Sequence, residues 1–390
     1  MLLIKGGKVL TMNSISFQAS SVLIDNGKII EVGENIDIKD DAQVIDAKGC
    51  WVLPGLIDAH CHIGIMEENV GFEGRDVNEA SDPITPHMRA IDGINPLDSS
   101  FYDARKAGIT TVMTGPGSAN VIGGQFVVMK TSGNCVDDMI IKEPAAMKIS
   151  FGENPKKIYN GKNKTPMTRM GIAALLRDTI IRTKNYQNKK IKALNNNENF
   201  EIDIKMEAMI PVLKKEIPLK AHVHRADDIL TAIRIAKEFN LDITLDHCTE
   251  GILIIDKVRN SMAPVLIGPV MTSKSKIEIK NKSIATPGEL NRAGIKIAII
   301  TDHPVTPIGY LSICAGLAVK EGLGMIDALK AITINAAEIL GISDRKGSIQ
   351  KGKDADIAIF DGNPLDMYTN TVYTIIDGNV VYNKYEELVK

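Results

Sequence analysis

The stretch Leu56-Ile57-Asp58-Ala59-His60-Cys61-His62 decides the fold of this chain. The apolar run that leads into it, starting at Trp51, predicts a strand that is buried on both faces. Alternate side chains of a strand share a face, so His60 and His62 project side by side while Cys61 points away. Two neutral imidazoles at this spacing can hold one metal ion. By itself the pair also fits a structural role, so the metal hypothesis needs further ligands elsewhere.

The middle of the chain, from about residue 54 to 345, alternates apolar strand-like runs with helical patterns. This alternation predicts an α/β fold with a parallel sheet. Eight parallel strands would close into a (β/α)8 TIM-like barrel, whose chemistry lies at the carboxyl ends of the strands. Segment 116–124 is too short for a helix, so the third unit is irregular or misassigned. The eight expected strands are 55–62, 109–115, 125–131, 145–152, 219–224, 242–248, 265–269 and 296–302.

Both ends of the chain are rich in short β-type runs with turn signals between them. Asn26-Gly27 and Asp377-Gly378 are dipeptides typical of tight hairpin turns. Neither end has enough strands to bury a sheet face alone, so we expect the two ends to combine. The sequence therefore predicts a barrel over residues 54–345 and a small β-sandwich domain built from both termini, residues 1–53 plus 346–390.

Helical periodicity marks three further segments, 98–107, 227–239 and 325–340. The loop over 66–96 follows the first strand and would cover a site at the carboxyl face of a barrel. Segment 183–203 carries repeated lysines and asparagines, and we interpret it as a solvated segment without chemistry.

Composition excludes several classes of partner. The 390 residues include 46 Lys plus Arg against 48 Asp plus Glu, so there is no basic field for nucleic acid. No apolar run reaches membrane-spanning length, and the amino terminus is too broken for a signal peptide. Five scattered cysteines, none in a Cys-x-x-Cys pair, fit a reducing cytoplasm. We expect a cytoplasmic protein with a small-molecule substrate. The sequence leaves open whether the protein forms a homo-oligomer.

Six of the seven histidines fall at or beside the carboxyl end of an expected strand. Any one of them could be an ordinary core histidine. Strand ends converge near the axis of a closed barrel, however, so four strands that present imidazole or carboxylate at the same end imply a metal centre. The six are His60, His62, His222, His224, His247 and His303, and only His87 lies in a loop.

These residues carry a family resemblance that covers essentially the whole chain. The segment 54–62, the histidines of the fifth and sixth strands, Thr301-Asp302 and the tail 346–356 resemble the amidohydrolase superfamily, closest to its imidazolonepropionase-related group. The resemblance implies a metal-dependent hydrolase with one or two divalent ions. Zinc suits imidazole and carboxylate ligands best, with manganese or iron as alternatives. The resemblance also implies an enzyme that acts on amide or related carbon–nitrogen bonds.

The resemblance assigns roles to particular residues. It implies that His60 and His62 hold the buried metal and that His222 and His247 hold the other. Asp302 would contact metal and substrate water, take a proton from that water and pass it to the leaving nitrogen. Read otherwise, Asp302 caps a helix ahead of Pro304. With His222 as the ligand from the fifth strand, His224 would meet the substrate or support a ligand.

The bridging ligand between two such metals stays open. Members of the superfamily use either a carboxylated lysine on the fourth strand or a glutamate, and this chain offers both Lys148 and Glu153. Odd spacing puts the two on opposite faces of a continuous strand, so at most one is expected to reach the metal. We favour Glu153, because it lies at the carboxyl end. A surface lysine and a loop carboxylate are the plain alternatives.

Substrate contacts are less constrained. Arg75 resembles the arginine that holds a substrate carboxylate in imidazolonepropionases, although a solvated surface arginine fits equally well. The glycines of 115–124 could let the backbone approach a ligand. The resemblance implies cleavage of a cyclic amide, with a prolidase-like dipeptidase or an N-acyl amino acid deacylase as alternatives. The alternative from another functional class is a catalytically inactive structural protein of the same fold. Loss of the metal ligands would identify such a protein.

Overall fold

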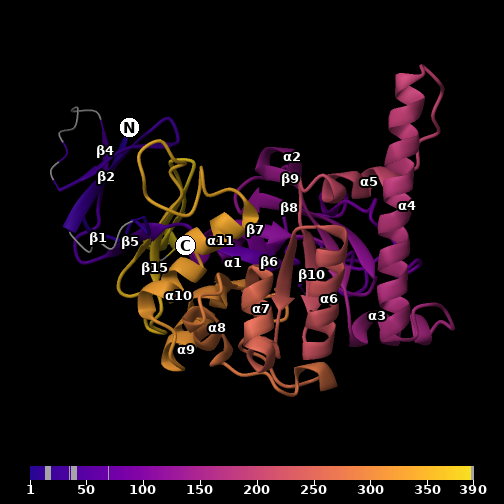
Figure 1. The fold of residues 1–390 in the computed structure, drawn as a ribbon. Coiled ribbons are helices and arrows are strands. Elements are labelled where there is room, and N and C mark those ends of the chain that lie inside the picture. The colour runs from indigo at the N-terminus through magenta and orange to yellow at the C-terminus, as the bar shows by residue number, and fades with distance from the viewer. Residues whose placement is uncertain (14–18, 35, 37–41, 69, 388–390) are drawn as a thin grey trace.

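The computed structural model describes residues 1–13, 19–34, 36, 42–68 and 70–387. Within these ranges the strands form two sheets of eight strands each. Figure 1 shows the two sheets, with helices packed around the one that carries the site. No helix in the described ranges combines the length and the apolar character needed to cross a membrane.

The barrel sheet contains all eight expected strands, but they are not all parallel. Strand β8 runs antiparallel to both of its neighbours, β7 and β9. The reason lies in segment 116–124, because a parallel connection needs a crossover of a dozen or more residues. The prediction of eight parallel strands is therefore wrong at this one unit. In sheet order the strands are β6 (Leu56–Cys61), β7 (Ile109–Thr114), β8 (Ile122–Lys130), β9 (Ile140–Ser150), β10 (Leu219–Val223), β11 (Ile243–His247), β12 (Val265–Ile267) and β13 (Ile297–Ile299).

Backbone hydrogen bonds just beyond β13 bring the two edges of this sheet together. The Asp302 amide donates to the His60 carbonyl at 3.1 Å, and the His62 amide donates to the His303 carbonyl at 2.8 Å. The buried Asp58 carboxylate reinforces the junction, because it accepts from the Thr301 amide and hydroxyl. The sheet is thus a nearly closed barrel, and its closure places the end of the first strand beside the end of the eighth.

The helices confirm the sequence patterns in part. Asp98 caps α1 (Ser99–Lys106), and α6 (Ala226–Phe239) lies where periodicity predicts it. The helix expected over 325–340 is split in two, α10 (Met325–Ala331) and α11 (Ile334–Leu340). Apart from α4 (Arg169–Asn195) and α5 (Ile204–Leu213), the other α-helices of the described ranges are α2 (Val136–Met139), α3 (Glu153–Asn160), α7 (Ile255–Ser261), α8 (Thr286–Arg292), α9 (Leu311–Lys320) and α12 (Lys384–Glu387).

Much of segment 183–203 belongs to a long helix, which the sequence reading missed. Helix α4 (Arg169–Asn195) has 27 residues and starts where the Thr168 side chain accepts from the Gly171 amide. It packs against α5 (Ile204–Leu213) and projects beyond the barrel (Figure 1). The polar composition that suggested a solvated segment belongs to the exposed face of this helix.

Strands from both ends of the chain pair in the second sheet. Its order is β16 (Asn379–Asn383), β15 (Thr371–Ile376), β14 (Ile357–Phe360), β5 (Trp51–Pro54), β1 (Leu2–Val9), β2 (Ala19–Asp25) and β3 (Lys28–Gly33), with β4 (Gln43–Asp46) also on β1. This is one sheet, so the predicted two-sheet sandwich is not confirmed. The domain boundaries at residues 53 and 346 stay a prediction.

Gly55 is the point where the chain passes from one sheet to the other. A Cβ atom there would lie 2.2 Å from the Thr110 hydroxyl oxygen, so only glycine fits. Its amide donates to the Asp356 carbonyl beside the terminal sheet. The next amide, of Leu56, donates to the Gly108 carbonyl beside the barrel strands. This junction sets the position of β6, and hence of the histidines at its end.

Candidate metal centre

His60, His62 and Asp302 form the first group of potential metal ligands. Asp302 Oδ1 lies 3.3 Å from Nε2 of His60 and 3.3 Å from Nε2 of His62. The two histidines are buried, and the Asp302 side chain is 14% exposed. Their ligand atoms all lie within 4.8 Å of one another, as one small ion requires. The His-x-His pair and the eighth-strand aspartate meet as the sequence predicts.

Neighbouring acceptors fix which nitrogen of each ring is free. His62 Nδ1 lies 2.6 Å from the carbonyl oxygen of Gly115, which can only accept, so Nδ1 carries the proton. His60 Nδ1 lies 3.0 Å from the Asp246 carboxylate. Burial lowers the pKa of His60 to about 4, which keeps the ring neutral. Both Nε2 lone pairs are therefore turned toward the Asp302 oxygen, which is how ligands face a shared cation.

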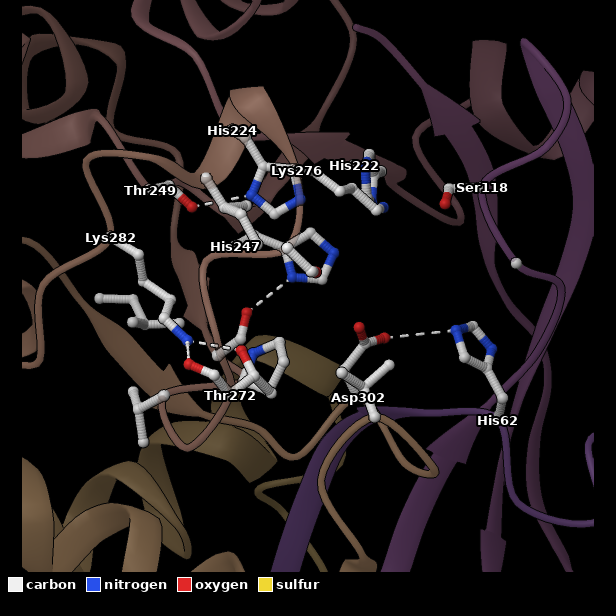
Figure 2. A pocket seen from close by; sticks show the side chains of 18 of the residues that line it. His62, Ser118, His222, His224, His247, Thr249, Thr272, Lys276, Lys282 and Asp302 are labelled. Atoms are coloured by element: carbon white, nitrogen blue, oxygen red, sulfur yellow. Dashed lines mark hydrogen bonds and ion pairs between the residues drawn. The ribbon is translucent and has the colours of Figure 1, made fainter. Parts of the chain in front are cut away.

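His222, His224 and His247 form the second group, at the ends of β10 and β11. Figure 2 shows the three rings gathered on one side of the pocket, opposite Asp302 and His62. His247 Nδ1 donates to the Gly268 carbonyl at 2.7 Å, which leaves its Nε2 lone pair free. Burial lowers the pKa of all three, that of His224 to about 3, so all are neutral and able to bind a metal.

Unusual backbone conformations aim two of these side chains. His247 has φ +68° and Asp302 has φ +55°, both in the left-handed region that non-glycine residues rarely adopt. Strand alternation sends Asp246 toward the buried interior, where it meets His60. His247, the residue after Asp246, also reaches the site, because its left-handed backbone conformation turns the chain there. Such outliers gather at functional sites because the surrounding structure must hold them in place.

Lys148, and not Glu153, lies against the first group. Lys148 Nζ is 3.4 Å from His60 Nε2, and burial lowers the pKa of this lysine to about 8. Glu153 starts α3 after Gly152, whose φ of +84° turns the chain out of β9. The Glu153 side chain lines a separate hollow, outside the pocket described below. The structure does not bring Glu153 to the histidines, because the chain leaves the strand before it.

Asp246 and Lys220 belong to the buried surroundings of the site, and sequence reasoning missed both. Lys220 Nζ lies 3.4 Å from the Asp246 carboxylate and donates to the Ala59 carbonyl at 3.2 Å. Burial raises the pKa of Asp246, but Lys220 and His60 outweigh it, so the pKa falls well below its usual value. A signal was available, because Asp246 directly precedes His247 in the expected sixth strand.

A pocket of about 370 Å³ joins the two groups. Its lining includes Met66, Val77 and Asn78 of the loop that we expected to cover the site. Arg75 is exposed on that loop and is absent from the lining, so the structure does not place it where it could hold a substrate. The lining also holds two lysines that the sequence reading missed, Lys276 and Lys282, from the segment between β12 and α8.

The chain matches the model of the amidohydrolase family over residues 51–382. It belongs to this family. Members are hydrolases that act on carbon–nitrogen bonds, and this chain is accordingly an enzyme of that class.

Relatives differ in how much they share. A crystal structure of an amidohydrolase from Thermotoga maritima MSB8 is 44% identical, with a TM-score of 0.96 over 98% of this chain and 100% of that one. Amidohydrolase tasK of Hapsidospora irregularis is 27% identical over 93% of this chain, which spans only 40% of its length. An imidazolonepropionase of Thermoplasma volcanium is 23% identical over 94% of this chain and 91% of its own. A solved prolidase, 17% identical with a TM-score of 0.59, shares the fold.

Proposed function

We propose that this amidohydrolase uses one or two divalent metal ions to hydrolyse an amide or cyclic amide C–N bond of a small molecule. One observation carries the proposal: two groups of buried imidazoles, one with a carboxylate, open into a single pocket of about 370 Å³. The two groups contain every histidine and aspartate that the family resemblance implies as a metal ligand. An inactive protein of the same fold would have no reason to keep this arrangement.

The donor set fits zinc. Imidazole nitrogens and carboxylate oxygens are its usual ligands, and no cysteine of the described residues joins either group. Manganese and iron accept the same donors. When bound, a divalent ion lowers the pKa of a water molecule and polarises the carbonyl under attack.

Asp302 is the proposed proton carrier. Burial raises its pKa, but the imidazoles of His60 and His62 beside it outweigh this and hold the pKa well below its usual value. The carboxylate therefore stays charged and can accept a proton from the attacking water. Because it lines the pocket, it can then return that proton to the leaving nitrogen.

Lys148 is the residue we now propose as the bridge between two ions. Its buried amine lies beside His60 and lines the pocket that also contains the second group. Its lowered pKa makes a neutral, nucleophilic amine more accessible, as carboxylation by carbon dioxide requires. The carbamate so formed would supply two oxygens, one for each ion. Glu153 belongs to neither group of potential ligands among the described residues, so we propose Lys148 in its place.

The pocket also favours a substrate with an anionic group. Lys276 and Lys282 line it together with apolar side chains such as Ile267, Val270 and Ile279. A carboxylate near these ammonium groups and an apolar body against the rest would match N-acyl amino acids, dipeptides and imidazolone-type acids alike. Since Arg75 lies outside, the lysines replace it as candidate carboxylate contacts. We keep the cyclic amide first, with the prolidase-like and deacylase activities as alternatives.

The test is a hydrolysis screen with matched substrate pairs. Cyclic amides, N-acyl amino acids and dipeptides are each offered as the free acid and as the carboxamide of the same skeleton. We expect turnover of a free acid with kcat/KM at least ~10-fold above its carboxamide, because one charge-assisted contact is lost. Metal-loaded protein that hydrolyses no member of the panel would contradict the proposed substrate class. A cytoplasmic location and a homo-oligomer stay predictions.

A further inference from the structure

The two groups of ligands share a pattern that the sequence does not reveal. In the first, one carboxylate oxygen lies at equal distance from the Nε2 atoms of a His-x-His pair, His60 and His62. In the second, Glu278 Oε1 lies 3.7 Å from His222 Nε2 and 3.8 Å from His224 Nε2, and these histidines also form a His-x-His pair. We propose that Glu278 is a metal ligand, which binds a divalent cation together with His222 and His224.

The distances favour ligands of one ion over a hydrogen-bonded pair. A separation of 3.7 or 3.8 Å is too long for a hydrogen bond between nitrogen and oxygen. Two atoms that each bind zinc at about 2.0–2.2 Å with tetrahedral angles stand roughly 3.3–3.6 Å apart. The corresponding separations in the first group are 3.3 Å. A small inward movement of Glu278 would bring the second group to the same geometry.

The Nε2 atom of His222, the ring nitrogen near Glu278, carries a lone pair and no proton. Asn154 Nδ2 lies 3.4 Å from His222 Nε2, and the orientation of that amide is fixed from its other side. Asn154 Oδ1 accepts from Lys276 at 2.9 Å, so the nitrogen must be the atom that points to His222. An N–H group directed at Nε2 requires a lone pair there. His222 Nε2 therefore has no proton to donate to Glu278 Oε1, and a cation bound by both atoms would make their approach favourable.

The rest of the fold holds Glu278 in place. Its Oε2 atom accepts from the Glu153 amide at 2.9 Å, at the start of α3, where the helix dipole favours a negative charge. The adjoining Gly152 has no Cβ, and one built there would lie 2.7 Å from that same Oε2. Glu278 is 2% exposed, and its Oε1 atom has no hydrogen-bond partner. One oxygen is therefore anchored, while the other is turned toward the histidines.

Two other roles for Glu278 lead to different expectations. Lys276 Nζ lies 3.8 Å from Oε1, so the carboxylate could be a plain counter-ion of that half-exposed lysine. Alternatively it could only tie the loop between β12 and α8 to α3. Neither role affects how tightly the histidines bind a metal, so metal affinity separates them from the proposal.

The experiment uses the full chain, freed of metal by a chelator and titrated with Co²⁺. Glu278→Gln keeps the shape of the side chain and an oxygen for the Glu153 amide, but loses the charge. Glu250→Gln is the matched control. Glu250 is also buried, and its carboxylate holds the same loop through hydrogen bonds of 2.8 Å from Asn281 and from the Ala226 amide. Its backbone amide, which the change leaves in place, donates to the His224 carbonyl.

We expect Glu278→Gln to weaken binding of one Co²⁺ equivalent by more than ~10-fold, since even partners that only hydrogen-bond to metal ligands contribute that much. Its visible Co²⁺ absorption should change as well. Glu250→Gln should retain both wild-type properties. Folded Glu278→Gln protein with wild-type affinity and spectrum would overturn the proposal.

A measurement on the wild type covers the case in which Glu278→Gln does not fold. Anomalous scattering from zinc-loaded crystals should place an ion within about 2.5 Å of Glu278 Oε1. An ion bound by His222 and His247, with Glu278 remote from it, would refute the assignment. The inference rests on the proposed metal dependence alone, and neither readout needs a substrate. Failure of the substrate screen therefore leaves it standing, and its own failure leaves the hydrolase proposal intact.

Discussion

The two His-x-His groups of the site differ in where their carboxylate originates. Asp302 follows a barrel strand, so the closure of the barrel itself brings it to His60 and His62. Glu278 lies in η3 (Ile277–Ile279), within the loop between β12 and α8, and reaches His222 and His224 from outside the barrel. The first group is thus built by the sheet, whereas the second depends on a loop that also lines the pocket.

This difference has a functional consequence. Ligands on strands are held by the barrel core, but a ligand on a loop can respond to what occupies the pocket. Lys276 and Lys282 belong to the same loop as Glu278. We therefore expect the first group to control whether the enzyme works at all, and the second group to link metal binding with substrate binding.

The largest effect is expected from His60→Ala. This change removes a strand-borne ligand that also contacts Asp302 and Asp246, so we predict loss of one metal equivalent and hydrolysis at background level. Metal analysis and steady-state kinetics measure both. His87→Ala is the control, since His87 lies in a loop outside both groups. A fully metal-loaded, fully active His60→Ala protein would break the comparison.

Asp302→Asn should come next. It keeps the shape of the side chain but removes the proposed proton carrier, so kcat should fall by at least ~10²-fold, the lower range for general acid–base catalysis. The barrel should stay folded, as circular dichroism can show. Normal turnover by this variant would mean that another group moves the proton.

Lys148→Met should lower kcat by roughly 10-fold or more, because the barrel would lose the group proposed to bridge the two ions. Glu153→Gln is the matched change at the residue that the sequence favoured, and it should stay within about twofold of wild type. Kinetics and metal content of both variants decide between them. Equal activity of the two would remove Lys148 from the site.

The smallest effect concerns the loop side of the pocket. Lys282→Met should raise KM for an anionic substrate by about 10-fold and change kcat little, because it removes a binding contact and leaves the reacting groups in place. Arg75→Met should change neither constant, since Arg75 is exposed outside the pocket. A rise in KM for Arg75→Met alone would restore the role that the family resemblance suggests for that residue.

Strand-borne features could be predicted from the sequence for a physical reason. Apolar runs mark buried strands, and the carboxyl ends of strands in a barrel converge, so His60, His222, His247 and Asp302 could be brought together without coordinates. The direction of β8 could not be derived in the same way. It follows from a connection too short for a crossover, which the sequence shows only as an irregular unit.

Other differences between the sequence predictions and the structure have the same cause, because local sequence patterns do not show the path of the chain. Glu153 looked correctly placed at the end of β9, but the positive φ of Gly152 turns the chain away before it. The polar residues of 183–195 form the exposed side of the second half of α4, where too few apolar residues stand out. Glu278 follows no motif, and only the path of its loop carries it to the histidines.

The measurement that tests the central claim most directly is removal and return of the metal in the wild-type enzyme. Purified protein is assayed on the best substrate of the screen before chelation, after chelation, and after titration with Zn²⁺. The account predicts that hydrolysis falls to background without metal and recovers as one or two equivalents bind, while the fold persists. Metal-free protein that hydrolyses its substrate at an undiminished rate would contradict it.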